Sequence, residues 1–197
     1  MRKKNTLFLA VFTIWAVAGR ICYSQTDKGH FMVGGSIGNL SFQNDYFGIS
    51  FSPTVGYFVI DNLVTGLIPS FEYDSFKLPN GNKTKSTSLG VGPFVRYYFG
   101  EGKLKPLLNA SFLYYKNTTK PGYSPVDPND PVLEKDHIIK QSYKFIQAGG
   151  GVAYFLSKSI AVEGIVNYGH YMDYNILGSD KSNEVNISLG FQIFLGK

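Results

Sequence analysis

The stretch FGISFSPTVGYFV, residues 47–59, decides the fold. Its odd-numbered positions carry apolar or aromatic side chains and one proline, whereas its even-numbered positions carry Gly, Ser and Thr until Phe58. An alternation with a period of two over these 13 residues predicts a β-strand with two unlike faces.

The same pattern recurs along the rest of the chain. Two segments, 63–74 and 88–99, repeat it closely. Weaker versions cover 30–39, 105–116, 142–156, 159–173 and 184–196. The sequence therefore predicts a single all-β domain with eight strands.

The connections between these strands alternate in length. Three are tight, at 60–62, 100–104 and 157–158. The connections at the other end are the short 40–45 and the generous 75–86, 117–141 and 174–183. Short periplasmic turns and longer external loops are typical of outer-membrane barrels. We therefore expect an eight-stranded antiparallel up-and-down transmembrane β-barrel in the bacterial outer membrane, with both termini in the periplasm.

The first 24 residues have the layout of a secretory signal peptide. Basic residues at positions 2–4 precede an apolar run, 7–19, and a small-residue approach that ends at Ser24. The run is shorter than the roughly 20 residues of a membrane-spanning helix. We expect cleavage after Ser24, which leaves 25–197 as the barrel domain. The cleaved segment holds four basic residues and no acid, so the net charge falls from +5 to +1 and gives no reason to expect a nucleic-acid partner. It also holds Cys22, the single cysteine.

The two faces of the strands indicate which one meets lipid. One face is apolar, and the other is mostly Gly, Ser, Thr, Asn and Gln, with few charges. A soluble barrel would place many charged side chains on its outer face. This composition favours a membrane barrel with a tightly filled interior over a soluble ligand-binding barrel. Pro53, Pro69 and Pro93 lie mid-strand on the apolar face, where we expect local bulges.

Three stretches carry a family resemblance. GPFVRYYF at 92–99, YFVIDNL at 57–63 and GGGVAYFL at 149–156 resemble the outer-membrane β-barrel domain family common in Bacteroidetes. The resemblance spans essentially all of 25–197. It implies an architecture similar to the small eight-stranded OmpX and OmpA barrels, and a place in the outer membrane. It implies no reaction.

The last predicted strand carries a second resemblance. It is similar to the signal by which the barrel-assembly machinery recognises its clients, which has a polar residue, a glycine and two hydrophobic residues at fixed spacing. The matching positions are Ser188, Gly190, Ile193 and Leu195. The chain departs from that pattern by continuing for two residues, to Lys197.

Four charged residues are predicted to point into the barrel: Glu72, Asp74, Arg96 and Glu163. Because a narrow interior has no room for unpaired charge, we expect an ion network around Arg96, with Glu72 or Glu163 as its partner. The network could line a polar path for ions or act as a structural plug. Eight strands enclose a space that side chains just fill, which favours the plug. We expect the filling side chains to include Phe58, Phe94, Tyr98, Phe155 and Phe194.

Candidate catalytic groups form no recognisable set. His30, His137 and His170 share no metal-ligand spacing, and His170 lacks the serine two residues later that outer-membrane deacylases require. The pair Asp74-Ser75 matches acyltransferase barrels in residue type, but the short loop 40–45 offers no histidine. The sequence predicts no enzyme, no catalytic residues, no cofactor and no metal.

The function predicted is that of a small outer-membrane barrel with a structural, surface-interaction or adhesion-type role and a side-chain-filled lumen. A narrow channel or a barrel for a small apolar ligand is the alternative, and a lipid-A-modifying enzyme is a weaker one. The expected partners are outer-membrane lipid and lipopolysaccharide, and the barrel-assembly machinery. Loop 117–141, rich in Pro, Lys and acids, could contact an extracellular partner or form a solvated cap.

Overall fold

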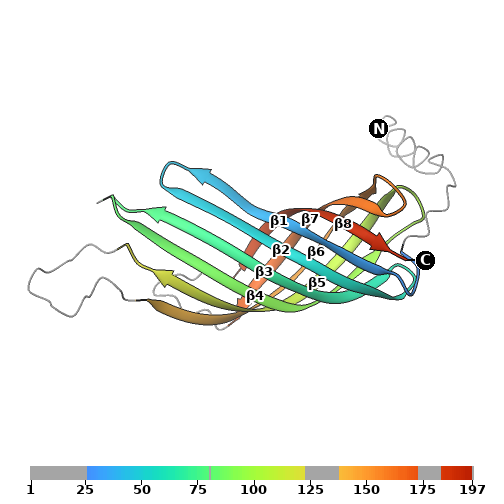
Figure 1. The fold of residues 1–197 in the computed structure, drawn as a ribbon, viewed down its shortest axis with the longest axis horizontal. Coiled ribbons are helices and arrows are strands. Elements are labelled where there is room, and N and C mark those ends of the chain that lie inside the picture. Colours follow the sequence, from blue (N-terminus) through green and yellow to red (C-terminus); the bar gives the residue numbers. More distant parts are fainter. Residues whose placement is uncertain (1–25, 80, 123–137, 173–182, 197) are drawn as a thin grey trace, which may run out of the picture.

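The structure is a computed structural model that describes residues 26–79, 81–122, 138–172 and 183–196, with the backbone alone described for 39–43. The expected signal peptide, 1–24, lies outside the described residues. Eight antiparallel strands follow one another around a closed barrel, and β1 pairs with β8 to close it (Figure 1). The strands are β1 (Phe31–Gln43), β2 (Tyr46–Ile60), β3 (Leu63–Lys77), β4 (Lys83–Tyr98), β5 (Leu104–Lys120), β6 (Ile139–Phe155), β7 (Ile160–Met172) and β8 (Asn183–Leu195). The predicted fold class is confirmed.

The two ends of the barrel differ and are named here by their connections. The turn end carries the short connections 61–62, 99–103 and 156–159. Thr26 also lies there, because its carbonyl accepts a hydrogen bond from the Asn62 amide at 2.6 Å. The loop end carries the turn 44–45, the hairpin tip 78–82 and the connections that follow β5 and β7. An even number of strands returns the chain to the end at which it started, so β8 ends beside the start of β1 (Figure 1).

Three predicted loops are wrong in their extent. The shortest, 40–45, shrinks to the turn 44–45, because β1 continues to Gln43. β3 and β4 continue to Lys77 and from Lys83, so the connection predicted at 75–86 shrinks to 78–82. β5 and β6 similarly occupy both ends of 117–141, and residues 123–137 of that loop lie outside the described part of the chain. These extensions are mostly polar, with Phe76 and Ile139 as exceptions, so they lack the regular alternation that revealed the strands elsewhere.

The bulges expected at the mid-strand prolines are also wrong. The register between β2 and β3 is the same at Phe51↔Phe71 and at Val55↔Leu67, which places Pro53 opposite Pro69. Because proline has no backbone N–H group, neither strand can donate a hydrogen bond from this position of the β2–β3 ladder. The Ser52 and Ser70 hydroxyls, 3.0 Å apart, join the same two strands on the inner face beside this gap. The register shifts that do occur lie between Gly38 and Ser41 and between Phe58 and Ile60.

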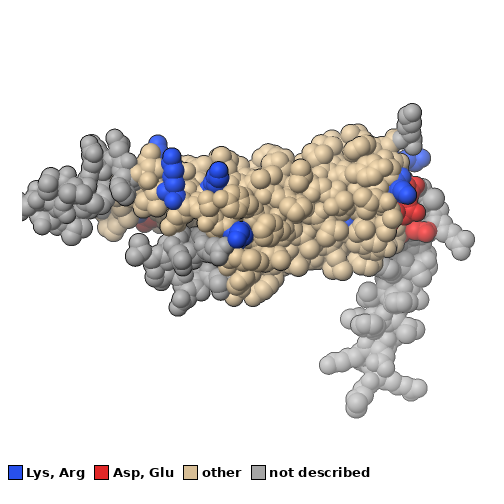
Figure 2. All heavy atoms as spheres, turned by 90° about the horizontal axis from the view of Figure 1, so that it is seen from below, with Lys and Arg blue, Asp and Glu red and all other residues tan. Residues whose placement is uncertain are grey.

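A continuous apolar belt surrounds the outside of the barrel. Its most exposed members lie on β8, where Val185, Ile187 and Leu189 are 66–68% exposed. On the face shown in Figure 2, charged side chains gather toward the two ends, and the broad stretch between them is almost free of charge. Among the described residues, no helix is long and apolar enough to cross a membrane. Aromatic residues edge the belt near both ends, as in a membrane barrel: Phe31, Tyr57, Tyr97, Phe99 and Tyr154 toward the turn end, and Phe71, Tyr114 and Tyr168 toward the loop end.

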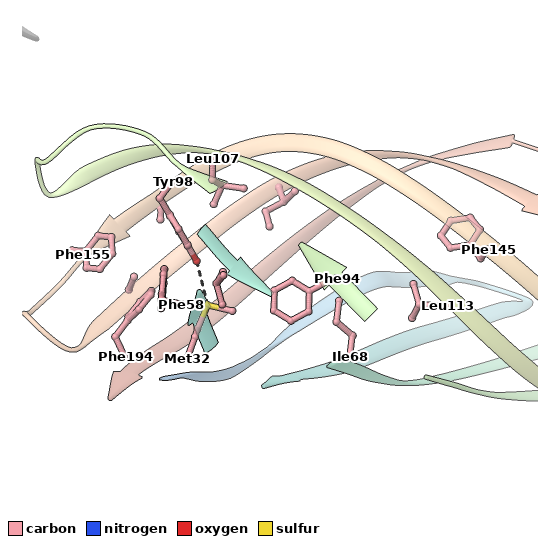
Figure 3. Packing of buried hydrophobic residues seen from close by; sticks show 14 of the residues in the cluster. Met32, Phe58, Ile68, Phe94, Tyr98, Leu107, Leu113, Phe145, Phe155 and Phe194 are labelled. Carbon is pink, nitrogen blue, oxygen red and sulfur yellow. Dashed lines mark hydrogen bonds between the residues drawn. The ribbon is translucent and has the colours of Figure 1, made fainter. Parts of the chain in front are cut away.

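The core of the molecule is the inside of the barrel. Large inward side chains lie over inward glycines of neighbouring strands, so the cross-section fills without widening. Phe94 is an example, because a Cβ at Gly66 would come within 2.8 Å of its ring. Figure 3 shows a dense group around Phe58, Phe155 and Phe194 near the turn end, with Phe145 far along the barrel toward the loop end.

Candidate functional site

The interior of the turn-end half is closed by an aromatic layer. Phe58, Tyr98, Phe155 and Phe194 come from four strands, and none is more than 2% exposed. Phe194 is central: its ring centroid lies 6.0 Å from that of Phe58, 6.1 Å from that of Tyr98 and 5.1 Å from that of Phe155. Met32 completes the layer, with its Sδ 3.3 Å from the Tyr98 hydroxyl (Figure 3). Rings from four alternate strands thus meet inside the turn-end half of the lumen.

A buried ion pair lies directly above this aromatic layer. Arg96 Nη1 on β4 forms a salt bridge with Glu163 Oε2 on β7, and the two side chains are 5% and 1% exposed. The other Glu163 oxygen accepts a hydrogen bond from the Tyr98 hydroxyl at 2.6 Å. Arg96 Nε donates to Asn109 Oδ1 at 3.2 Å. Each charged group therefore has several polar partners, which is the condition for retaining a charge in such a place.

Of the four charges predicted inside, the structure brings only Arg96 and Glu163 together. Val64, and not Glu72, pairs with Arg96 across β3 and β4, because Glu72 lies further along β3 toward the loop end. Asp74 lies further still and accepts a hydrogen bond from the Tyr46 hydroxyl at 2.7 Å. The single network expected around Arg96 therefore divides between the two ends, because the stagger of the strands separates its members along the barrel.

A buried lysine near the turn end escaped the sequence analysis. Lys105 is 2% exposed, and its Nζ donates to Thr26 Oγ1 at 2.8 Å and lies 5.4 Å from the centre of the Phe155 ring. Thr26 in turn donates to Asn62 Oδ1. The alternation of β5 could have found it, since Lys105 has the same parity as the inward Leu107 and the opposite parity to the outward Leu108. Lys105 thus closes the barrel below the aromatic layer.

Polar side chains connect the ion pair to the loop-end half. Asn109 Nδ2 donates to Asn167 Oδ1, and Asn167 Nδ2 donates to Asn186 Oδ1, both at 3.4 Å. Asn186 then donates to Gln147 Oε1 at 3.3 Å. This chain of amides crosses from β5 to β8 and fills the middle of the lumen without charge.

The loop-end half holds a small recess of about 60 Å³. Its volume admits a few water molecules at most. Glu72 and Glu184 contribute to its wall, and Tyr115 and Phe145 form an aromatic side. Its other lining residues are polar or small: Ser36, Gly38, Ser50, Ser52, Gln147, Asn186 and Ser188.

The candidate catalytic groups are not assembled in the described part of the barrel. Asp74 points inward to Tyr46, and Ser75, the next residue of the same strand, points to the opposite face. His170 Nδ1 lies 2.8 Å from Asn183 Oδ1, His30 is at the turn end, and His137 lies outside the described residues. The described residues contain no group of three His, Cys, Asp or Glu side chains that could hold a metal ion.

The four positions of the assembly-signal resemblance divide between the two faces of β8. Ser188 and Gly190 point inward, whereas Ile193 and Leu195 are 36% and 51% exposed on the apolar belt. Gly190 is opposite Glu163 and Ser36, where its missing side chain leaves room beside the ion pair. These placements do not test recognition by the assembly machinery.

A closed barrel of eight meandering strands, filled inside and apolar outside, defines the class of small outer-membrane β-barrels. Solved structures of that class are similar to this chain. Neisserial surface protein A (NspA) matches with a TM-score of 0.51 and 15% identity, over 85% of this chain and 97% of that one. OprG from Pseudomonas aeruginosa matches with a TM-score of 0.53 and 13% identity, over 88% of this chain and 99% of that one. These similarities establish the fold.

The outer-membrane enzyme PagL also matches, with a TM-score of 0.38 and 11% identity over 84% of this chain and 99% of that one, which is too low to bear on activity. The chain matches no protein-family model and no curated protein. The resemblance to the Bacteroidetes family is therefore not supported beyond the shared architecture.

Proposed function

We propose that the protein resides in a bacterial outer membrane as a barrel closed by its own side chains, with a structural or surface-interaction role. The observation that carries this proposal is the turn-end closure. Five side chains of the aromatic layer, the Arg96–Glu163 pair and Lys105 are all at most 5% exposed and together occupy the cross-section. A pore of any useful conductance would need these groups to move apart.

The belt supports the membrane location. Its side chains remain exposed in numbers that water would not tolerate on a soluble protein, since exposed apolar patches beyond a few hundred Å² are rare on monomers. With the turn end in the periplasm, as the connection lengths favour, the loop end faces outside and presents the connections as its surface for partners. The assembly machinery would then recognise β8 from the periplasm, through Ser188, Gly190, Ile193 and Leu195.

The alternative of a barrel for a small apolar ligand has less support. The walls of the recess inside the barrel are mainly polar and include two glutamates. Apolar ligands are held by predominantly apolar pockets.

Two measurements test the proposal together. The full chain, expressed in a bacterium with an outer membrane, should fractionate with that membrane and leave it only on detergent extraction. The purified folded barrel should show no steady single-channel conductance in planar bilayers. Recovery of the protein in the soluble fraction, or a large steady conductance, would contradict the proposal.

A matched pair of variants locates the closure. Phe194→Ala removes the centre of the aromatic layer, and Phe191→Ala removes a ring of the same size from the outward face of β8. We expect brief conductance openings for Phe194→Ala and none for Phe191→Ala. Equal behaviour of the two variants would place the closure elsewhere in the lumen.

A further inference from the structure

The outer surface of the loop end is basic along four adjacent strands. Every lysine on β3 to β6 outside the turn end is exposed, and each has the parity of the outward belt residues of its strand. We call this set the lysine arc. Its members are Lys77, Lys83, Lys85, Lys116, Lys120, Lys140 and Lys144.

The arc stands directly against the apolar belt. Lys116 pairs across the strands with Leu89, which is 60% exposed, and Lys144 pairs with Tyr114, which is 40% exposed. Lys120 and Lys85 form a pair four residues further along β5 and β4 toward the loop end than Lys116 and Leu89. A long aliphatic stem that runs along apolar surface and ends in an ammonium group is suited to the boundary between hydrocarbon and headgroups.

Like charges oppose one another within the arc. Lys85 is the cross-strand partner of Lys120, and Lys77 is the partner of Lys83. Like charges directly opposite on a sheet are destabilising unless an anion lies between them. Glu72 and Asp74, the acids of β3 near this height, point inward, and among the described residues no acid shares the outward face of β3 to β6 at the loop end.

The arc is local to this side and this end of the barrel. At the loop end, the described outward side chains of β2, β7 and β8 include no lysine or arginine. The turn end carries both signs, with Asp27, Lys28, Asp61, Glu101, Lys103 and Lys158. On the face shown in Figure 2, basic side chains predominate toward the loop end, whereas basic and acidic side chains are mixed at the turn end.

We propose that the lysine arc binds the phosphate groups of lipid headgroups in the leaflet that surrounds the loop end. This inference rests on the proposed membrane location and adds to it a site and a ligand chemistry. The headgroup phosphates lie at the height where the belt ends, and a phosphate between Lys85 and Lys120 would relieve their repulsion.

The test uses the folded full chain in neutral detergent and diphosphoryl lipid A as the probe, with bound lipids counted by native mass spectrometry. The variant Lys85→Gln/Lys116→Gln/Lys120→Gln removes three charges from the arc. The matched control Lys28→Gln/Lys103→Gln/Lys158→Gln removes three from the turn end. We expect binding to weaken about tenfold or more in the first variant and by less than about twofold in the second, because electrostatic attraction is local to the charges removed.

Two further arms identify the source of the phosphate. Lipid A stripped of its phosphates should bind the unmodified barrel as weakly as diphosphoryl lipid A binds the arc variant. Inorganic phosphate should not displace the lipid, because it lacks the acyl chains that contact the belt. Equal binding by all variants, equal loss in the control, or displacement by inorganic phosphate would overturn the inference.

The folded state of each variant is checked by its strand circular dichroism and by its heat-dependent shift in gel mobility. Fractionation of the arc variant separates the two proposals. A variant that still reaches the outer membrane but no longer binds lipid A supports the arc, whereas unmodified protein found outside the membrane would remove the basis of both proposals.

Discussion

The two halves of the lumen are filled by different chemistry. In the turn-end half, aromatic rings and one ion pair exclude water, and Glu163 has all its partners within the protein. In the loop-end half, Glu72 and Glu184 share a recess with serines and amides, and both are only partly buried. The same residue type therefore has different surroundings along one barrel: a carboxylate near the turn end is paired within the core, and a carboxylate near the loop end lines a polar recess.

The largest effect on stability is expected at Glu163, and its absence would contradict the difference between the two halves of the lumen. Replacing Glu163 by Leu leaves the Arg96 guanidinium buried without its counter-charge, so we expect the free energy of unfolding to fall by about 3–5 kcal/mol. The measurement is denaturant unfolding of the folded barrel in zwitterionic micelles. The matched variant Glu72→Leu changes a carboxylate of the recess and should cost less than about 1 kcal/mol.

A second variant tests whether the loss comes from the stranded arginine. In Arg96→Met/Glu163→Leu both charges are gone and apolar side chains of similar size fill the space, so most of the lost stability should return. If the double variant is as unstable as Glu163→Leu, packing around Glu163 and not the uncompensated charge is responsible.

The inward face of this barrel was predictable from strand parity, but the choice between Glu72 and Glu163 as the partner of Arg96 was not. The alternation at 88–99 is enough to direct Arg96, Phe94 and Tyr98 inward. Arg96 and Glu163 lie on β4 and β7, which are not neighbours in the sheet, so their meeting depends on the stagger accumulated around the closed barrel. No pattern within a single strand predicts that accumulated stagger.

The remaining errors have local causes. Lys105 follows Leu104 at the start of β5, where a lysine beside a turn is usually solvated, so its inward parity within the predicted strand was passed over. The loop-end extensions of β3 and β4 are polar apart from Phe76, because both lie at the edge of the apolar belt, so their composition resembles that of loops. The recess arises from small side chains on several strands, and no single strand indicates it.

A smaller effect on the free energy of unfolding is expected in the apolar belt on the outside of the barrel. Pro53 and Pro69 face each other on β2 and β3, where neither can donate to the other's carbonyl. The double variant Pro53→Val/Pro69→Val restores two donors, and we expect the free energy of unfolding to rise by about 1 kcal/mol, since a lipid-facing carbonyl without a donor is unfavourable. Chemical unfolding in phosphatidylcholine vesicles measures it. Pro93→Val, on β4, serves as a control that lacks a facing proline, and an equal gain there would assign the effect to backbone propensity alone.

The smallest effect should come from the recess. In Glu72→Gln/Glu184→Gln the shape of the wall is kept and two like charges are removed, so we expect the free energy of unfolding to change by no more than about 0.5 kcal/mol, with a gain favoured at low salt. Tyr171 donates to Glu184 Oε2 at 2.8 Å, and a glutamine oxygen can still accept that bond. Unfolding curves at low and high salt give both the size and the sign. A loss of several kcal/mol would mean that these carboxylates are as structural as Glu163, and the distinction between the two halves of the lumen would then be wrong.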